Sequence, residues 1–161
     1  MKRFLCLLLL LILLLCACAN EDQVTFYYCP ADYLNGQTGT LLLPETRSVT
    51  GYTENPQFLI ALYLTGPLEQ DLVSPFPTGT KLKTLLQTEN ELTIQLYDLP
   101  QSISDSEFSL ACAAMTMTCL EFTGAKSVTI LSGDRSITMD RTMLTLSDSP
   151  TATQTTEGAT S

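Results

Sequence analysis

The sequence predicts an α+β protein with one domain, in which a single sheet is covered on one face by two helices. Two pairs of apolar, β-rich segments are each joined by turn residues, as in hairpins. Two other segments begin with helix-capping residues and end close to a glycine. Because these helices alternate with the hairpins and a last strand, the expected order is β-β-α-β-β-α-β, which is typical of helices packed on a sheet.

The N-terminal residues 1–17 are predicted to be a lipoprotein signal peptide, with Cys18 as the lipidated residue. A short basic start precedes twelve apolar residues at 4–15, too few to cross a membrane, which takes about 20, but typical of a secretory signal. The run ends in Leu-Cys-Ala-Cys, which resembles the bacterial lipobox. Cys18 is favoured over Cys16 because the large Leu15 directly precedes Cys16. An ordinary secretory signal with incidental cysteines is the alternative.

Lipidation predicts attachment to the extracytoplasmic face of the cell membrane. A diacylglyceryl-Cys carries two acyl chains, with a third where the organism adds one, and two suffice for stable anchoring. Residues 18–23 form a short tether, so we expect the domain to lie close to the lipid.

The chain that remains after signal removal is predicted to be strongly acidic. The sequence has eight Lys and Arg against seventeen Asp and Glu, and residues 1–17 contain two of the basic side chains and none of the acidic ones, so the net charge becomes −11. This charge argues against a nucleic acid partner, whose binding depends on Lys and Arg. It also argues against electrostatic adhesion to anionic lipid.

The predicted domain, residues 24–146, opens with a hairpin. Residues 24–28 (VTFYY) and 40–49 (TLLLPETRSV) are β-rich, and turn residues at 35–39 separate them. Pro44 suits an edge strand.

A first helix is predicted at 57–64, after a polar cap and Pro56. Its apolar run resembles a strand, but the cap and the Gly66-Pro67 stop favour a helix. The Pro-rich connector that follows, to about residue 80, is interpreted as a structural joint. Its Leu72, Val73 and Phe76 are candidate contacts for a partner.

The second hairpin and second helix occupy residues 81–122. Residues 81–87 and 91–97 flank a short turn, and the second of them alternates strictly between apolar and polar residues. A capping box at 104–107 begins a helix to about residue 122. Its expected core stripe is Phe108, Ala111, Cys112, Met115, Cys119 and Phe122.

The C-terminal part is predicted to contain a strand at 127–131, a Gly-Asp turn and an edge strand within 137–146. Residues 147–161 are rich in Ser and Thr without an apolar run, and are predicted to be disordered.

The segments at the joints of this order resemble the GerMN domain, the sporulation and germination module of bacterial envelope proteins. The matching segments, in order, are LLLPETRSV, NPQFLIALYLTGP, PFPTGTKLKTL, ELTIQL and EFSLACAAMTMTCLEF…AKSVTILSGD. They span about residues 24–134. The chain differs in having Met-Thr-Cys-Leu at 117–120 where the family has Asn-Thr-Leu, and in having one copy of the domain where some relatives have two. The resemblance implies a part in sporulation or germination, in the assembly of a multiprotein complex at the membrane.

The residue types present favour a protein that is not an enzyme. There is no His and no Trp, which excludes Ser-His-Asp and Cys-His nucleophile pairs and His-based metal sites. We predict no cofactor, no metal site and no catalytic residue. The acidic residues that stay open as alternatives lie where caps and solvated loops are expected: Asp32, Glu54, Glu69, Asp71, Asp105 and Glu107.

Two further features leave alternatives open. Cys29, Cys112 and Cys119 are expected to be buried free thiols, with a disulfide from Cys29 to one of the others as the alternative. Arg47 lies in an apolar strand, where it either pairs with an acid such as Glu45 or Glu54 or presents a charge to a partner.

The sequence therefore predicts a lipid-anchored module for protein–protein interaction. The resemblance to the GerMN domain implies envelope or sporulation-complex proteins as partners, with self-association as an extension. The alternatives are a lipoprotein that binds a small ligand between sheet and helices, and a hydrolase that uses the acids named above. A deep apolar pocket with convergent polar groups would favour the ligand-binding alternative, and an exposed apolar patch the interaction module.

Overall fold

The structure is a computed structural model that describes residues 22–33, 40–100 and 102–144. It confirms an α+β fold. The predicted signal peptide, Cys18 and the tail at 147–161 lie outside the described residues. The elements in chain order are β1 (Gln23–Pro30), β2 (Leu43–Ser48), α2 (Pro56–Tyr63), β3 (Leu72–Val73), β4 (Leu82–Gln87), β5 (Glu91–Leu96), α3 (Asp105–Phe122), β6 (Ser127–Ser132), β7 (Arg135–Asp140) and α4 (Arg141–Leu144).

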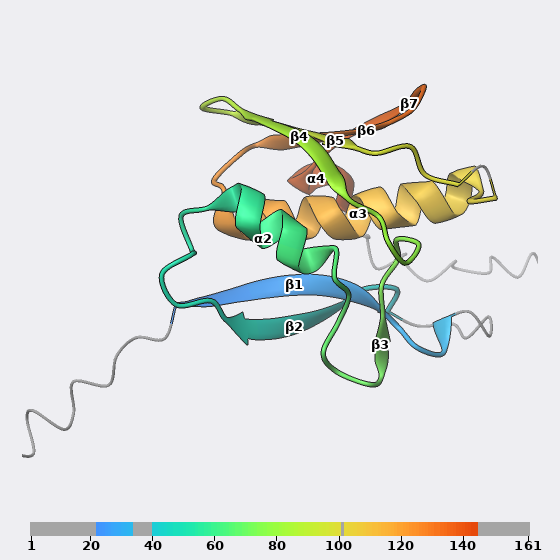
Figure 1. Ribbon diagram of the computed structural model, residues 1–161, viewed down its shortest axis with the longest axis horizontal. Helices are drawn as coiled ribbons and strands as arrows, with labels where there is room; N and C mark the ends of the chain where they lie inside the picture. The colour runs from blue at the N-terminus through green and yellow to red at the C-terminus, as the bar shows by residue number, and fades with distance from the viewer. Residues whose placement is uncertain (1–21, 34–39, 101, 145–161) are drawn as a thin grey trace, which may run out of the picture.

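The strands form two sheets, so the prediction of a single sheet was wrong. One sheet has the order β2-β1-β3 and the other β4-β5-β6-β7. Figure 1 shows the smaller sheet at the bottom, the larger one at the top, and α2 and α3 between them. Helix α3 contacts β1 on one side and β6 and β7 on the other. The helices therefore form a middle layer rather than a cover on one face.

The residues of α3 explain this difference. The sequence predicted one apolar stripe on α3. Every residue of that stripe is buried except Phe122, which is half-buried. Ala114, Thr116, Thr118 and Leu120 are buried as well. A helix that is buried around most of its circumference needs a neighbour on more than one side, and small side chains such as Ala114 allow those neighbours to approach closely.

Strand β1 is the central strand of the smaller sheet, and α3 lies along the part of its edge that no strand covers. Strand β2 pairs with β1 in antiparallel register from Gln23↔Ser48 to Tyr28↔Leu43, which confirms the first hairpin. Strand β3 pairs only with Cys29 and Pro30. The edge of β1 before that point is covered by α3, because the Tyr27 N–H donates to Thr118 Oγ1 at 2.9 Å.

The larger sheet is mixed. Strands β4 and β5 form the second predicted hairpin, β5 runs parallel to β6 with α3 as the crossover, and β7 pairs antiparallel with β6. Alternate residues of β5 and β6, from Leu92 to Ile130, are buried toward the helices. On β5 and β6 the opposite face carries Ser, Thr and Gln side chains together with Glu91 and Leu131. Thr129 and Thr138 are hydrogen-bonded there across β6 and β7 at 2.8 Å.

The helix ends follow the sequence signals. Asn55 caps α2 by accepting the Phe58 N–H, with Pro56 as the first helical residue. Ser104 and Glu107 form the capping box of α3, and Gly124 follows its end with a φ of +67°, as a helix C-terminus often requires.

Two short elements were not predicted. The connector after α2 contains β3, whose two residues are too few for an alternating pattern to show. The expected edge strand within 137–146 begins earlier, at Arg135, and gives way to α4 at Arg141. The Asp140 carboxylate accepts the N–H groups of Thr142 and Met143, which is the capping arrangement expected at the start of α4.

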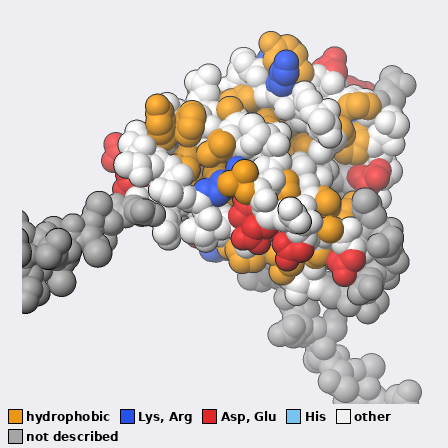
Figure 2. Space-filling view, turned by 60° about the horizontal axis from the view of Figure 1, so that its bottom comes forward, with side chains coloured by type: hydrophobic (Ala, Val, Ile, Leu, Met, Phe, Trp, Pro, Cys, Tyr) orange, Lys and Arg blue, Asp and Glu red, His pale blue; other side chains and the backbone are white. Residues whose placement is uncertain are grey.

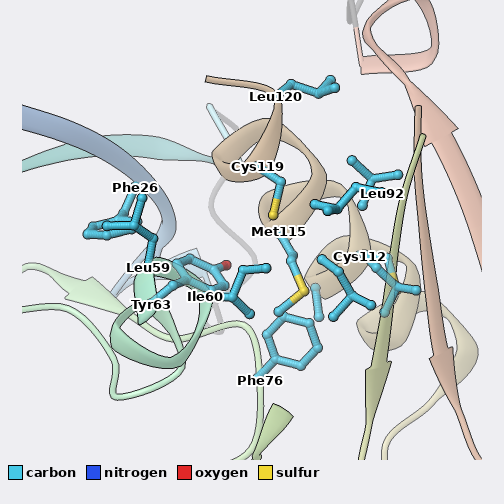
Figure 3. Packing of buried hydrophobic residues seen from close by; sticks show 14 of the residues in the cluster. Phe26, Leu59, Ile60, Tyr63, Phe76, Leu92, Cys112, Met115, Cys119 and Leu120 are labelled. Atoms are coloured by element: carbon cyan, nitrogen blue, oxygen red, sulfur yellow. The ribbon is translucent and has the colours of Figure 1, made fainter. Parts of the chain in front are cut away.

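The core lies between the two sheets and around α3. Figure 3 shows Met115 and Cys119 of α3 directed between Tyr63 and Ile60 on one side and Leu92 on the other. Tyr63 stacks on Tyr28 with ring centroids 4.9 Å apart. Phe76 meets Tyr63 edge-on at 6.3 Å, which fixes the connector to the same core.

Candidate interaction surface

An apolar groove lies along the side of α3 that neither sheet covers. Its volume is about 350 Å³. Leu110, Ala113 and Met117 of α3 form its floor, and they lie three and four residues apart, on one stripe of the helix. The walls are Thr40, Leu41 and Leu42 before β2 on one side, and Thr138, Met139, Met143 and Leu144 on the other.

The rim of this groove is accessible. Leu41 is 40% exposed and Met143 is 66% exposed. Met117, Met139 and Met143 give the groove three unbranched, adaptable side chains of the kind found on surfaces that accept varied apolar partners. Eight of its ten lining residues are apolar, the other two are Thr, and none is charged.

A polar border adjoins the groove at one end. Arg141 and Glu121 form an exposed ion pair there at 3.4 Å, beside a smaller hollow of about 150 Å³ that shares Met117 and Leu144 with the groove. An apolar centre with a polar, solvated border is the usual anatomy of a protein interface. Small-molecule sites in contrast combine an apolar pocket with several precisely placed polar groups.

Arg47 is buried and forms a structural ion pair, so it does not present a charge to a partner. Its guanidinium bonds Glu45, and the two side chains are 5% and 2% exposed. It lies over the rings of Phe26 and Tyr28, with Cζ at 5.1 and 5.6 Å from the centroids. Strand β2 places Glu45 and Arg47 two residues apart, hence on the same face.

The ion pair holds the chain that leaves α2. The Glu45 carboxylate accepts the N–H groups of Leu68 and Glu69 at 2.8 and 2.9 Å, and Arg47 donates to the Gly66 carbonyl at 2.6 Å. Burial would raise the pKa of the Glu45 carboxyl, but the Glu69 N–H, the Arg47 guanidinium and the Leu68 N–H hold this pKa below its usual value. The carboxylate is therefore ionised at neutral pH and fixes the start of the connector.

The predicted contact residues of the connector are mostly buried. Leu72 is 5% exposed and Phe76 4% exposed, so the expectation that they are available to a partner was wrong; Val73 is half-buried. The connector folds back so that β3 pairs with β1, and this pairing turns Leu72 into the core. The reading of the segment as a structural joint agrees with these contacts.

The cysteines that the structure describes are buried, and the described residues contain no cluster of cysteines and acids that could bind a metal. Cys29, Cys112 and Cys119 are buried free thiols, and burial raises the pKa of Cys29 to about 11 and that of Cys112 to about 12. Thiols that stay protonated are poor nucleophiles. No group of three or more Cys, Asp or Glu side chains is placed to hold a metal ion in this part of the chain. Nor does it contain a helix that is both long and apolar enough to cross a membrane.

The surface also carries many acidic side chains. In Figure 2, which brings the bottom of Figure 1 forward, they gather near the centre and at the lower right, whereas Lys and Arg are few. This distribution agrees with the acidic composition and offers no basic stripe for nucleic acid on that face.

Sequence reasoning missed the groove although its residues carried a signal. Leu110, Ala113 and Met117 stand outside the predicted stripe at helical spacing. A second apolar stripe on one helix indicates a second buried or unpartnered face. Which of the two stripes faces solvent depends on where the sheets pack.

Comparison with known proteins places the chain among germination-related domains. Residues 25–138 match the family described as "Germane: Sporulation and spore germination". The tandem GerMN domains of the sporulation protein GerM from Bacillus subtilis have a similar fold, with a TM-score of 0.53 and 16% identity over 70% of this chain and 39% of that one. A Clostridium perfringens protein named as a candidate lipoprotein gives a TM-score of 0.48 and 16% identity over 77% of this chain and 93% of that one. No curated protein matches the sequence.

Proposed function

Because the chain belongs to the Germane family of sporulation and spore germination domains, we propose that it acts as a lipid-anchored, non-catalytic interaction module of the cell envelope. It assembles with envelope or sporulation-complex proteins, and with other copies of itself. The chain spans about two fifths of the tandem-domain structure that it matches, so the proposal for its partners rests on its own surface.

The groove beside α3 carries the proposal. A monomer gains nothing by leaving Leu41, Met117 and Met143 around an open apolar hollow, since such surface costs free energy in water. The same residues stabilise a complex when an apolar side chain of a partner fills the hollow and displaces its water. The Arg141–Glu121 pair at the border supplies polar contacts. Such contacts contribute more to the orientation of a bound partner than to its affinity.

The groove variant Met143→Glu is expected to reduce partner capture at least tenfold. Met143 is 66% exposed, so the substitution leaves the core intact while it places a charge in the apolar hollow, which a bound partner would have to desolvate. Full-length protein bearing an affinity tag would be used to capture proteins from membranes of sporulating cells. Leu68→Glu, at a 77% exposed residue on the connector, is the matched control and is expected to capture as the unchanged protein does.

Equal recovery of envelope proteins by Met143→Glu and by the unchanged protein would contradict a role for the groove.

The volume of the groove, about 350 Å³, also lies within the range of small-ligand sites, which favours an apolar-ligand-binding lipoprotein as the second candidate. Native mass spectrometry separates the two: a small molecule that the unchanged protein retains and Met143→Glu loses, with no protein captured, would support the second candidate.

Membrane attachment is proposed to depend on Cys18. Cys18→Ala removes the thiol that carries the acyl chains, and the acidic chain has no electrostatic substitute for them. We expect the protein to move from the membrane fraction to the soluble fraction on cell fractionation. Cys16→Ala, two residues earlier, is the control and is expected to remain attached. Continued membrane retention of Cys18→Ala would contradict lipid anchoring at this residue.

A further inference from the structure

An exposed pair of aromatic rings lies between β2 and the first turn of α2. Tyr52 and Phe58 stack with ring centroids 4.2 Å apart and planes at 24°. Tyr52 is 49% exposed and Phe58 36% exposed, so the pair presents apolar surface to its surroundings. Single exposed apolar residues are ordinary, but two stacked rings form a preorganised surface whose burial requires little further ordering.

This pair is fixed to the point at which the chain enters the domain. The Asp22 carbonyl accepts the Val49 N–H at 2.8 Å, and the Asp22 carboxylate accepts the Gly51 N–H at 3.2 Å. The Tyr52 N–H in turn donates to the Val49 carbonyl at 2.9 Å. In Figure 1, β1 begins at the end of the molecule from which the loop between β2 and α2 projects.

The distance to the proposed anchor is short. Asp22 lies four residues after Cys18, and four residues span at most about 14 Å when fully extended. An acylated Cys18 therefore keeps the end of the domain that carries Tyr52 and Phe58 within reach of the lipid surface.

We propose that Tyr52 and Phe58 contact the interfacial region of the membrane and orient the domain on it. This inference rests on the proposed lipid anchoring at Cys18. Aromatic side chains favour the boundary between lipid and water, and the Tyr hydroxyl stays hydrated while its ring is buried. Two acyl chains alone fix the height of a domain but not its rotation. The aromatic pair supplies a second contact that does.

The charges around the pair indicate whether the proposed lipid contact is electrostatic or apolar. Asp22, whose carboxylate accepts the Gly51 N–H, lies beside the pair, and Glu54 follows Tyr52 by two residues; both are acidic. These two acids repel anionic headgroups, so the proposed contact comes from burial of the rings rather than from charge. It should form on zwitterionic vesicles and weaken as anionic lipid is added, more so at low salt.

The orientation would leave the groove free for a partner. Tyr52 follows the end of β2, whereas Leu41 at the rim of the groove precedes its start. A six-residue strand separates the two by about 20 Å. A domain that rests on Tyr52 and Phe58 thus keeps the rim at Leu41 away from the lipid.

The absence of Trp from the sequence allows a direct test. The variant Tyr52→Trp would be prepared with its lipid anchor and reconstituted in phosphatidylcholine vesicles. We expect its emission to shift to shorter wavelength and to be quenched by brominated lipid. Tyr97→Trp, at a 57% exposed residue just after β5, is the matched control and is expected to show neither change. Phe58→Ser added to Tyr52→Trp is expected to reduce the quenching.

Flotation of the same vesicles separates failure of this inference from failure of the anchor. If the Tyr52→Trp protein floats with the vesicles but its emission matches that of Tyr97→Trp, the aromatic contact is overturned while lipid anchoring stands. If the protein does not float, anchoring at Cys18 fails and the inference fails with it. Quenching that Phe58→Ser leaves unchanged would overturn the role of the second ring.

Discussion

Arg47→Met is expected to lower the free energy of unfolding by about 3–5 kcal/mol, as is usual when one partner of a buried ion pair is removed. The substitution leaves the Glu45 carboxylate, which is 2% exposed, with the N–H groups of Leu68 and Glu69 but without a cation. It also frees the Gly66 carbonyl. Urea unfolding at neutral pH, followed by circular dichroism, measures the loss.

The matched control for this prediction is Arg141→Met. Arg141 pairs with Glu121 at 3.4 Å, and their side chains are 67% and 39% exposed. An exposed pair of this kind contributes about 0–1 kcal/mol, so the same change of residue should have a much smaller effect. Equal losses at Arg47 and Arg141 would contradict the buried geometry of the first pair.

A double variant separates the charge from the packing. Glu45→Met combined with Arg47→Met removes both charges, and buried pairs replaced by apolar residues often retain or gain stability. Here Leu68 and Glu69 still lose their acceptor, which costs about 1–3 kcal/mol for each N–H that stays buried. We therefore expect the double variant to be more stable than Arg47→Met alone and less stable than the unchanged protein.

The longer elements of this fold could be predicted from local sequence because their signals are local. The capping box at Ser104 and Glu107, the Pro at 56 and the alternation in β5 each act within a few residues. All three appear in the structure where the sequence places them. Arg47 also contacts Gly66 and Tyr28, each 19 residues away from it in the sequence. These contacts have no local signal, so only the pairing of Arg47 with a nearby acid could be predicted.

The layers could not be predicted in the same way. Periodicity shows which residues of α3 are apolar but not how many neighbours the helix has. Ala114, Thr116 and Thr118 are small or weakly polar, so they carried no core signal although all three are buried. The groove depends on this arrangement, since Leu110 and Met117 stay partly exposed only because the two sheets occupy the other sides of α3.

The position of α3 between two sheets predicts opposite effects of one substitution at neighbouring sites. Thr118 Oγ1 accepts the Tyr27 N–H at the edge of β1. Thr116 is also buried, but its hydroxyl has no hydrogen-bond partner among the described residues. Two residues turn an α-helix by about 200°, so the two side chains point to opposite sides, and Thr116 faces away from β1.

Thr118→Val is expected to lower the free energy of unfolding by about 1–3 kcal/mol, because it leaves the Tyr27 N–H without its acceptor. Thr116→Val should raise it by about 1 kcal/mol, because it replaces an unpaired buried hydroxyl with a methyl group. Both substitutions keep the β-branched shape, so helix propensity and volume change little. Urea midpoints of the two variants, measured side by side, give the comparison. If Thr118→Val is as stable as Thr116→Val, α3 does not cover the edge of β1, and the smaller sheet must pack elsewhere.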